Sequence, residues 1–143
     1  MTDDKPFDFG WQNRRLSYGD ENKEIYQTLT RVQKSPFYQA YMTKIFIAAM
    51  SLGYKKGLKK KLKKKENALH GNSFTDQEKW LIISLYMKEN KHDPPINALF
   101  EPDAICNLAE EYANGGIKPL WDIYELTSEP VDELEKEFRK YLE

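Results

Sequence analysis

Apolar residues along the chain recur at intervals of three and four, which is the spacing of helices, and no long stretch shows the alternation of a strand. In the first third, Asp20 can cap a helix over about residues 22–33. Ile25, Leu29 and Val32 would form its apolar face. The pattern therefore predicts a helical beginning to the folded part of the chain.

The most apolar segment follows the sequence "KSPF". Ser35 as cap and Pro36 at the first helical position predict a helix that runs to Leu52 and ends before Gly53. Few of its positions are polar, because its apolar side chains are Phe37, Tyr41, Ile45, Phe46, Ala48, Ala49 and Leu52. We expect it to be the central and most buried helix.

A capping box marks the next helix. Thr75 and Glu78 have the spacing of such a box, directly before "KWLIISLYMKEN". Trp80, Ile83 and Met87 then share one face of the helix, and Ile82 and Tyr86 widen it. The double proline in "HDPP" ends the helical pattern.

Three more helices are expected in the last third. One covers about residues 103–113 and ends at "NGG", where Asn114 or Gly115 can adopt the left-handed conformation. A short one, "IKPLWDIYEL", has Pro119 in its first turn. A last helix, capped by Ser128, has an apolar face formed by Val131, Leu134, Phe138 and Leu142.

These elements define the expected fold class. We predict a mainly α, compact, single-domain bundle of five to six helices over residues 1–143. Residues 1–19 are expected to be an irregular N-terminal segment, and residues 55–72 a basic segment and loop. The stretch 67–74, "NALHGNSF", is where one short extended segment could form.

Composition narrows the class of protein. With 40% hydrophobic and 31% charged residues, the chain is too apolar for wholesale disorder. Its longest strongly apolar stretch, residues 44–54, is far shorter than the ~20 residues that span a bilayer. The N-terminus lacks the basic-then-apolar pattern of a signal peptide. We therefore expect a cytoplasmic protein without a membrane partner.

No arrangement of residues indicates catalysis, a metal or a cofactor. Cys106 falls at a position of the apolar face of its predicted helix, so we expect it to be a packed core thiol. His70 and His92 lie far apart, and His92, before two prolines, is expected to cap a turn. Glu110 and Glu111 are adjacent, so they would point about 100° apart on a helix, which suits solvent better than a paired-carboxylate site. The chain is predicted not to be an enzyme.

Charge is distributed very unevenly. Residues 55–65 contain eight lysines and no acid, whereas the chain as a whole has a formal net charge of −1. Residues 101–143 contain four Lys and Arg residues against twelve acids. The molecule is therefore dipolar, with one part suited to a polyanion and another that would repel it.

The lysines would form a stripe if the helix continued past Gly53. Positions i, i+1, i+4, i+5, i+8 and i+9 would share one side, about 15 Å long, and they are Lys55, Lys56, Lys59, Lys60, Lys63 and Lys64. Gly57 and the repulsion between like charges weaken such a helix. Three interpretations stay open: contact with nucleic-acid phosphates, contact with an acidic protein or membrane surface, and a solvated face that only keeps the protein soluble.

Three segments resemble a known family. They are "SPFYQAYMTKIFIAAMSLGYKKG" (35–57), "EKWLIISLYMKEN", and "ICNLAEEYANGGIKPL" (105–120). In this order they are similar to dnd system-associated protein 4, a family of small proteins encoded in islands for DNA phosphorothioation, a sulfur modification of the DNA backbone used in bacterial defence. The long lysine run is a departure from that resemblance. The resemblance implies a helical accessory protein of a DNA-targeting system, with no active site to carry over.

Together these observations predict a non-enzymatic accessory or adaptor protein of a prokaryotic defence system linked to DNA modification. Its lysines would contact phosphates without reading base sequence, because no arginine or aromatic residue is interleaved with them. An apolar or acidic helical surface would dock a larger protein of a defence complex. One alternative is a purely protein-binding subunit whose lysines only solubilise it. The other, a small nuclease component, is the least favoured, because no acidic metal site or histidine-based site is evident.

Overall fold

The computed structural model describes residue 11 and residues 14–90, 102–126 and 130–140. Within these residues it is mainly α, as predicted, with five α-helices and a two-stranded sheet. In chain order the elements are β1 (Arg15–Gly19), the 3-10 turn η1 (Asp20–Asn22), α1 (Lys23–Arg31), α2 (Met42–Lys56), β2 (Lys65–His70), the 3-10 turn η2 (Gly71–Ser73), α3 (Asp76–Glu89), α5 (Pro102–Leu126) and α6 (Pro130–Arg139).

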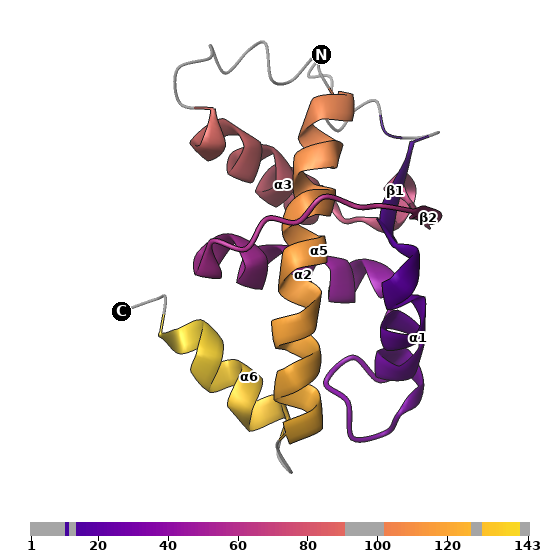
Figure 1. Cartoon of the computed structure of the whole chain (residues 1–143), viewed down its shortest axis with the longest axis vertical. Coiled ribbons are helices and arrows are strands. Elements are labelled where there is room, and N and C mark those ends of the chain that lie inside the picture. Colours follow the sequence, from indigo (N-terminus) through magenta and orange to yellow (C-terminus); the bar gives the residue numbers. More distant parts are fainter. Residues whose placement is uncertain (1–10, 12–13, 91–101, 127–129, 141–143) are drawn as a thin grey trace, which may run out of the picture.

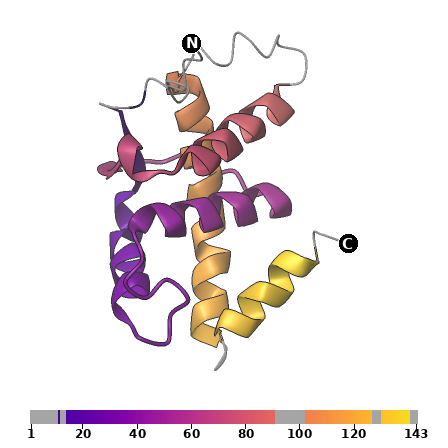
Figure 2. The ribbon, with the colours of Figure 1, turned by 180° about the vertical axis from the view of Figure 1, so that it is seen from behind.

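Helix α5 is the axis of the molecule (Figure 1). It contacts α2, α3, β1 and α6, so most other elements are positioned by it. Helix α2 crosses it on one side, and the chain that leaves α2 crosses back over the other side toward β2 (Figures 1 and 2). The long helix is therefore enclosed between α2 and the segment that follows α2.

Glycines bring α2 and α5 into backbone contact where they cross. A β-carbon added to Gly116 would overlap the carbonyl oxygen of Ala49, and one added to Gly53 would overlap that of Tyr112. No side-chain layer separates the two helices at these positions, so each glycine is required for the close approach. The crossing explains why small residues occupy these positions of both helices.

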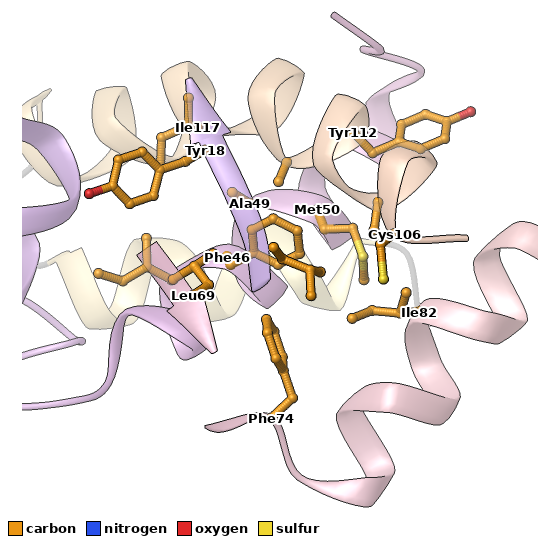
Figure 3. Close-up of a cluster of buried hydrophobic side chains, with 14 of the residues drawn as sticks. Tyr18, Phe46, Ala49, Met50, Leu69, Phe74, Ile82, Cys106, Tyr112 and Ile117 are labelled. Atoms are coloured by element: carbon orange, nitrogen blue, oxygen red, sulfur yellow. The ribbon is translucent and has the colours of Figure 1, made fainter. Parts of the chain in front are cut away.

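The core surrounds this crossing. Seven residues of α2 are buried, including Phe46, so α2 is a core helix as expected, but the central helix is α5, which contacts most of the other elements. Phe46 contacts the ring of Phe74 edge-on, with 5.7 Å between ring centroids. Figure 3 shows Met50, Cys106 and Ile82 pointing toward one another from α2, α5 and α3. Three helices that are distant in sequence thus share one apolar cluster.

Helix α2 begins and ends later than predicted. Residues 32–41 form turns, in which the backbone N–H of Phe37 donates to Ser35 Oγ (3.0 Å). Gln39 has a positive φ of 61°, which no helix continues through, and the helix begins at Met42. At the other end Gly53 is inside the helix, and Gly57, with φ 68°, is the C-cap. Pro36 therefore opens a turn and not a helix.

Helix α5 replaces the two helices that were predicted on either side of "NGG". It runs through Asn114, Gly115 and Gly116, and Pro119 lies inside it. The glycines serve packing rather than termination, because tertiary contacts override their low helix propensity. Pro119 has no N–H, so the carbonyl of Gly115, four residues earlier, lacks its usual partner within the helix.

The sheet lies partly where irregular structure was expected. β1 falls within residues 1–19, and it pairs antiparallel with β2, which overlaps the extended segment expected in 67–74. The pairing is irregular between Leu16 and Tyr18, which leaves Ser17 without a regular partner in the ladder. Both strands are short, and β1 is the more buried of the two.

Helices α1, α3 and α6 match their predictions in part. Asp20 lies in η1, and Asn22 occupies the position before α1, without a side-chain capping bond. The capping box of α3 is confirmed by both of its hydrogen bonds. Trp80, expected on the buried face of α3, is 41% exposed. In α6, Leu134 and Phe138 pack against the core as expected. Ser128, Leu142 and the side chain of Val131 lie outside the described part of the chain.

Among the helices that the structure describes, none combines the length and apolar character needed to cross a bilayer.

Replacing Gly116 by alanine should destabilise the protein by about 3 kcal/mol or more, because the new methyl group would push α2 away from α5. An alanine at an unconstrained helical position would instead stabilise by about 1 kcal/mol. Gly57→Ala is the control, because a β-carbon added to Gly57 would have no neighbouring atom within 4 Å. Only the positive φ of Gly57 opposes this change, at a cost of about 1–2 kcal/mol. Urea unfolding measures the free energy of unfolding of the parent protein and of both variants. A Gly116→Ala variant as stable as the parent would contradict the close crossing of α2 and α5.

Candidate nucleic-acid interface

The lysine-rich segment is not a continuation of α2, so the predicted helical stripe does not form. The left-handed Gly57 ends the helix after Lys56. Its N–H donates to Tyr54 O (3.2 Å), and the N–H of Leu58 donates to Gly53 O (2.7 Å). A glycine with a positive φ ends a helix at little cost, and like charges every fourth residue disfavour its continuation.

Residues 58–64 instead form what we call the lysine strap, which crosses α5 (Figure 1). The N–H of Lys60 donates to the carbonyl of Glu111 (3.1 Å). Asn114 Nδ2 donates to the carbonyls of Lys60 (3.2 Å) and Lys61 (3.3 Å). A β-carbon on Gly115 would overlap the carbonyl of Leu58, so this glycine admits the strap just as Gly116 admits α2. The strap is therefore held through its backbone.

The carbonyl of Lys64 completes the anchoring, because it accepts from the N–H of Asp20 (2.8 Å), where β1 leads into η1. Beyond it, Lys65 begins β2. Backbone hydrogen bonds thus hold the strap near both of its ends, so the side chains of Lys60, Lys61 and Lys63 are not needed to hold it in place.

The structure separates the six lysines of the predicted stripe. Lys56 pairs with Glu137 of α6 (2.7 Å), and Lys59 pairs with Glu89 of α3 (3.1 Å). Lys55 lies in the last turn of α2 and lines a groove between α2 and α3. Of the six, Lys59, Lys60, Lys63 and Lys64 belong to the strap.

Three strap lysines have their charge available. Lys60, Lys61 and Lys63 are exposed and make no ion pair with any residue that the structure describes. Lys64 lies 4.0 Å from Asp20, at the limit of an ion pair, and 82% of its side chain is exposed. Lys61 was not among the predicted site residues, since it would have lain on the other side of a helix. These four residues are the candidate interface.

Glu110 corrects another prediction, because it is buried and only 2% exposed. Its Oε2 accepts from the N–H of Ser17 (2.7 Å), which the irregular pairing of β1 leaves out of the ladder. Its Oε1 accepts from Lys65 Nζ (3.0 Å). The carboxylate thus satisfies an otherwise unpaired buried donor and fixes the start of β2 against α5. Spacing could have revealed it, because Cys106, Glu110, Ala113 and Ile117 recur at helical intervals along one face.

A second carboxylate fixes the beginning of the strap. Glu89 Oε2 accepts from the hydroxyl of Tyr112 (2.8 Å), and Lys59 Nζ lies 5.7 Å from the centroid of the Tyr112 ring. The Tyr112 hydrogen bond, and then Lys59, lower the pKa of Glu89. Burial, and then Glu89, raise the pKa of Tyr112 to about 12. The cluster joins α3, α5 and the strap.

The described residues offer little for catalysis. Cys106 is fully buried, as predicted, and burial raises the pKa of its thiol to about 11, although a hydrogen bond with Arg14 opposes the shift. Thiols in such surroundings are inert. No three metal-ligating side chains gather anywhere in the described residues. His70 is an exposed residue at the end of β2, and His92 lies outside the described residues.

Comparison with known proteins identifies a family that matches the chain. A family described as DNA sulphur modification system-associated protein 4 matches residues 15–137. In the same comparison, nothing among curated proteins or solved structures matches the chain. The matched range includes every helix and strand described above except the last two residues of α6.

The Glu89 cluster should make stability depend on pH in the acidic range. The pKa of Glu89 is lowered in the folded state, so its contribution is present above the ordinary value of 4.5 and is lost as pH falls through the lowered one. Glu89→Gln should cost about 1 kcal/mol at pH 7, and the difference from the parent should shrink as the pH falls below 4.5 and through the lowered pKa. Urea unfolding at several pH values measures this. Glu125→Gln, an exposed residue of α5, is the control, and a Glu89→Gln deficit that persists unchanged at pH 3 would contradict the assignment.

Proposed function

Because this chain belongs to the DNA sulphur modification system-associated protein 4 family, we propose that it is a non-enzymatic accessory protein that contacts nucleic-acid phosphates through the lysine strap. The family description associates it with a DNA sulphur modification system. The proposed contact is with phosphates and not with bases. Its proposed setting is the bacterial cytoplasm, in antiviral defence.

The observation that carries the proposal is the strap itself, whose charges are available while its backbone is anchored. Lys60 and Lys61 are held by Asn114 through their carbonyls, so their ammonium groups project from a fixed backbone. A pre-anchored segment loses less conformational entropy on binding than a mobile loop. Lysine is a strongly hydrated point charge that suits phosphates and offers no bidentate contact to a base edge.

An adaptor also needs a protein partner, and the exposed surface of α6 is a candidate site for one. Asp132, Glu133 and Glu135 are exposed on α6, away from the strap (Figure 1). Lys136, Arg139 and Lys140 are exposed on the same segment, so this surface is mixed in charge, which suits a protein partner better than nucleic acid. A larger protein of the system, docked on helical surface, would then be brought to nucleic acid by the strap.

One observation favours the alternative of a purely protein-binding subunit. Lys56, Lys59 and Lys65 each pair with a carboxylate of the same chain, so part of the lysine run already has a structural use. In that alternative the remaining lysines only solubilise the surface. The two functions differ in a measurable property, which is affinity for duplex DNA.

We expect the protein to bind unrelated duplexes equally, with a slope of log K against log salt of about −3, since three or four lysines are available and each contact contributes about −0.9. Changing Lys60, Lys61 and Lys63 together to Gln should flatten this slope and weaken binding to all sequences alike. Fluorescence anisotropy of two labelled duplexes at several salt concentrations measures both effects.

The matched control changes three lysines elsewhere, Lys23, Lys136 and Lys140, to Gln, which alters net charge equally but leaves the strap intact. If this control loses as much affinity as the strap variant, binding is due to overall charge. If the parent chain does not bind even at low salt, the strap has no role in nucleic-acid contact and the protein-binding alternative takes its place.

A further inference from the structure

A groove runs between α2 and α3, apart from the strap. It has a volume of about 130 Å³ and is lined by four residues of each helix, among them Ser51, Tyr54 and Lys55 of α2 and Leu81, Ser84 and Lys88 of α3. The two helices contribute in the same way: each supplies apolar residues, a serine, and a lysine in its last turn. The groove is therefore apolar along its length and basic at one end.

Helix α3 has more apolar surface than the core uses. Ile82 and Ile83 are buried, yet Leu81 is 44% exposed and Trp80 is 41% exposed. A helix that only covers a core places polar residues on its outer side. Here the outer side presents leucine to the groove, which is typical of a helix that has a second partner.

The size of the groove decides which kind of ligand fits. Sites for cofactors and other small organic molecules have volumes of about 300–1,000 Å³. A volume of about 130 Å³ holds only one or two side chains. An anchoring apolar side chain of a protein, inserted between Tyr54 and Leu81, therefore fits the groove better than a cofactor.

The charge at the groove indicates the chemistry of that protein. Lys55 and Lys88 both line it. Both lysines follow the apolar part of the groove at the C-terminal ends of their helices. A ligand with an apolar centre and carboxylates beyond it complements this order of apolar and basic groups.

We propose that the α2–α3 groove binds an acidic amphipathic helix of a partner protein. An apolar anchor of that helix packs against Leu81 and Tyr54, and its carboxylates face Lys55 and Lys88. Helix-in-groove binding of this kind reads anchors at helical spacing. The proposal goes beyond phosphate contact and does not depend on it, because the strap lysines 60, 61 and 63 do not line the groove.

The test uses synthetic peptides and the full chain. One labelled peptide carries leucines at positions i, i+3, i+4 and i+7 with glutamates flanking them; a second carries lysines in place of the glutamates, and a third has the first sequence scrambled. We expect only the glutamate peptide to bind, by fluorescence anisotropy. Leu81→Asp should weaken binding of this peptide at least tenfold. Because Leu81 is 44% exposed and not part of the buried core, circular dichroism and urea unfolding should show the fold intact.

Charge reversal provides the sharpest arm of the experiment. Lys55→Glu combined with Lys88→Glu should abolish binding of the glutamate peptide and create binding of the lysine peptide. The control pair, Lys23→Glu with Lys136→Glu, carries the same net charge and should bind like the parent chain. The proposal is supported if the groove variant prefers the lysine peptide while the control pair still prefers the glutamate peptide. Neither instability nor a change in net charge can produce that difference.

Four outcomes would overturn the proposal. They are no binding of the glutamate peptide at millimolar concentration, equal binding of all three peptides, binding that survives Leu81→Asp, and loss of binding in the control pair. Two further results would show that the groove binds a different ligand, and they would also overturn the proposal. One is a dimer in sedimentation that Leu81→Asp dissociates, and the other is binding of duplex DNA that the groove variants lose while the strap variant retains it.

Discussion

The backbone contact between α2 and α5 is the constraint on which the rest of the structure depends. Gly53 and Gly116 remove the side-chain layer that normally separates two helices, so the C-terminal end of α2 lies directly against α5. The chain can then turn at Gly57 and return over another side of the same helix as the strap. Gly115 makes room for the strap beside the glycine that makes room for α2. Two adjacent glycines thus position the main helix pair and the candidate interface together.

Ion pairs complete what the glycines begin. Lys59 and Lys65, just inside and just beyond the strap, contact Glu89 and Glu110 from α3 and α5. The pair with Glu110 is partly buried and also satisfies the bulged strand β1, whereas the pair with Glu89 lies nearer to solvent. The lysines between them keep their charge for a partner. The run of lysines is therefore divided by position: its ends hold the fold, and its middle is the part that can bind an anion.

The sequence correctly predicted features that depend on residues close together along the chain. The capping box at Thr75, the apolar content of α2 and the burial of Cys106 depend on a few neighbouring residues, and all three were predicted. The continuity of α5 through "NGG" could not be predicted, because glycines usually end isolated helices. Inside α5 they are favoured only by the close approach of α2 and of the strap. The lysine stripe failed for a related reason: it assumed a helix, whereas the carbonyl of Glu111 and the side chain of Asn114 offered the backbone other partners. Helical spacing places Glu110 on the buried face of α5, but its buried partner, the N–H of Ser17, depends on a strand bulge that no spacing rule contains.

Amide hydrogen exchange tests most directly whether the lysine segment is an anchored strap. The amides of Leu58 and Lys60 donate to Gly53 and Glu111, so both should exchange far more slowly than the amide of Lys61, which has no backbone partner among the described residues. Asn114→Ala should speed exchange at Lys60 while leaving α2 protected. Uniformly fast exchange from Leu58 to Lys61 would show a mobile loop, and uniform protection through Lys61 and Lys63 would show a continued helix; either result would contradict this account.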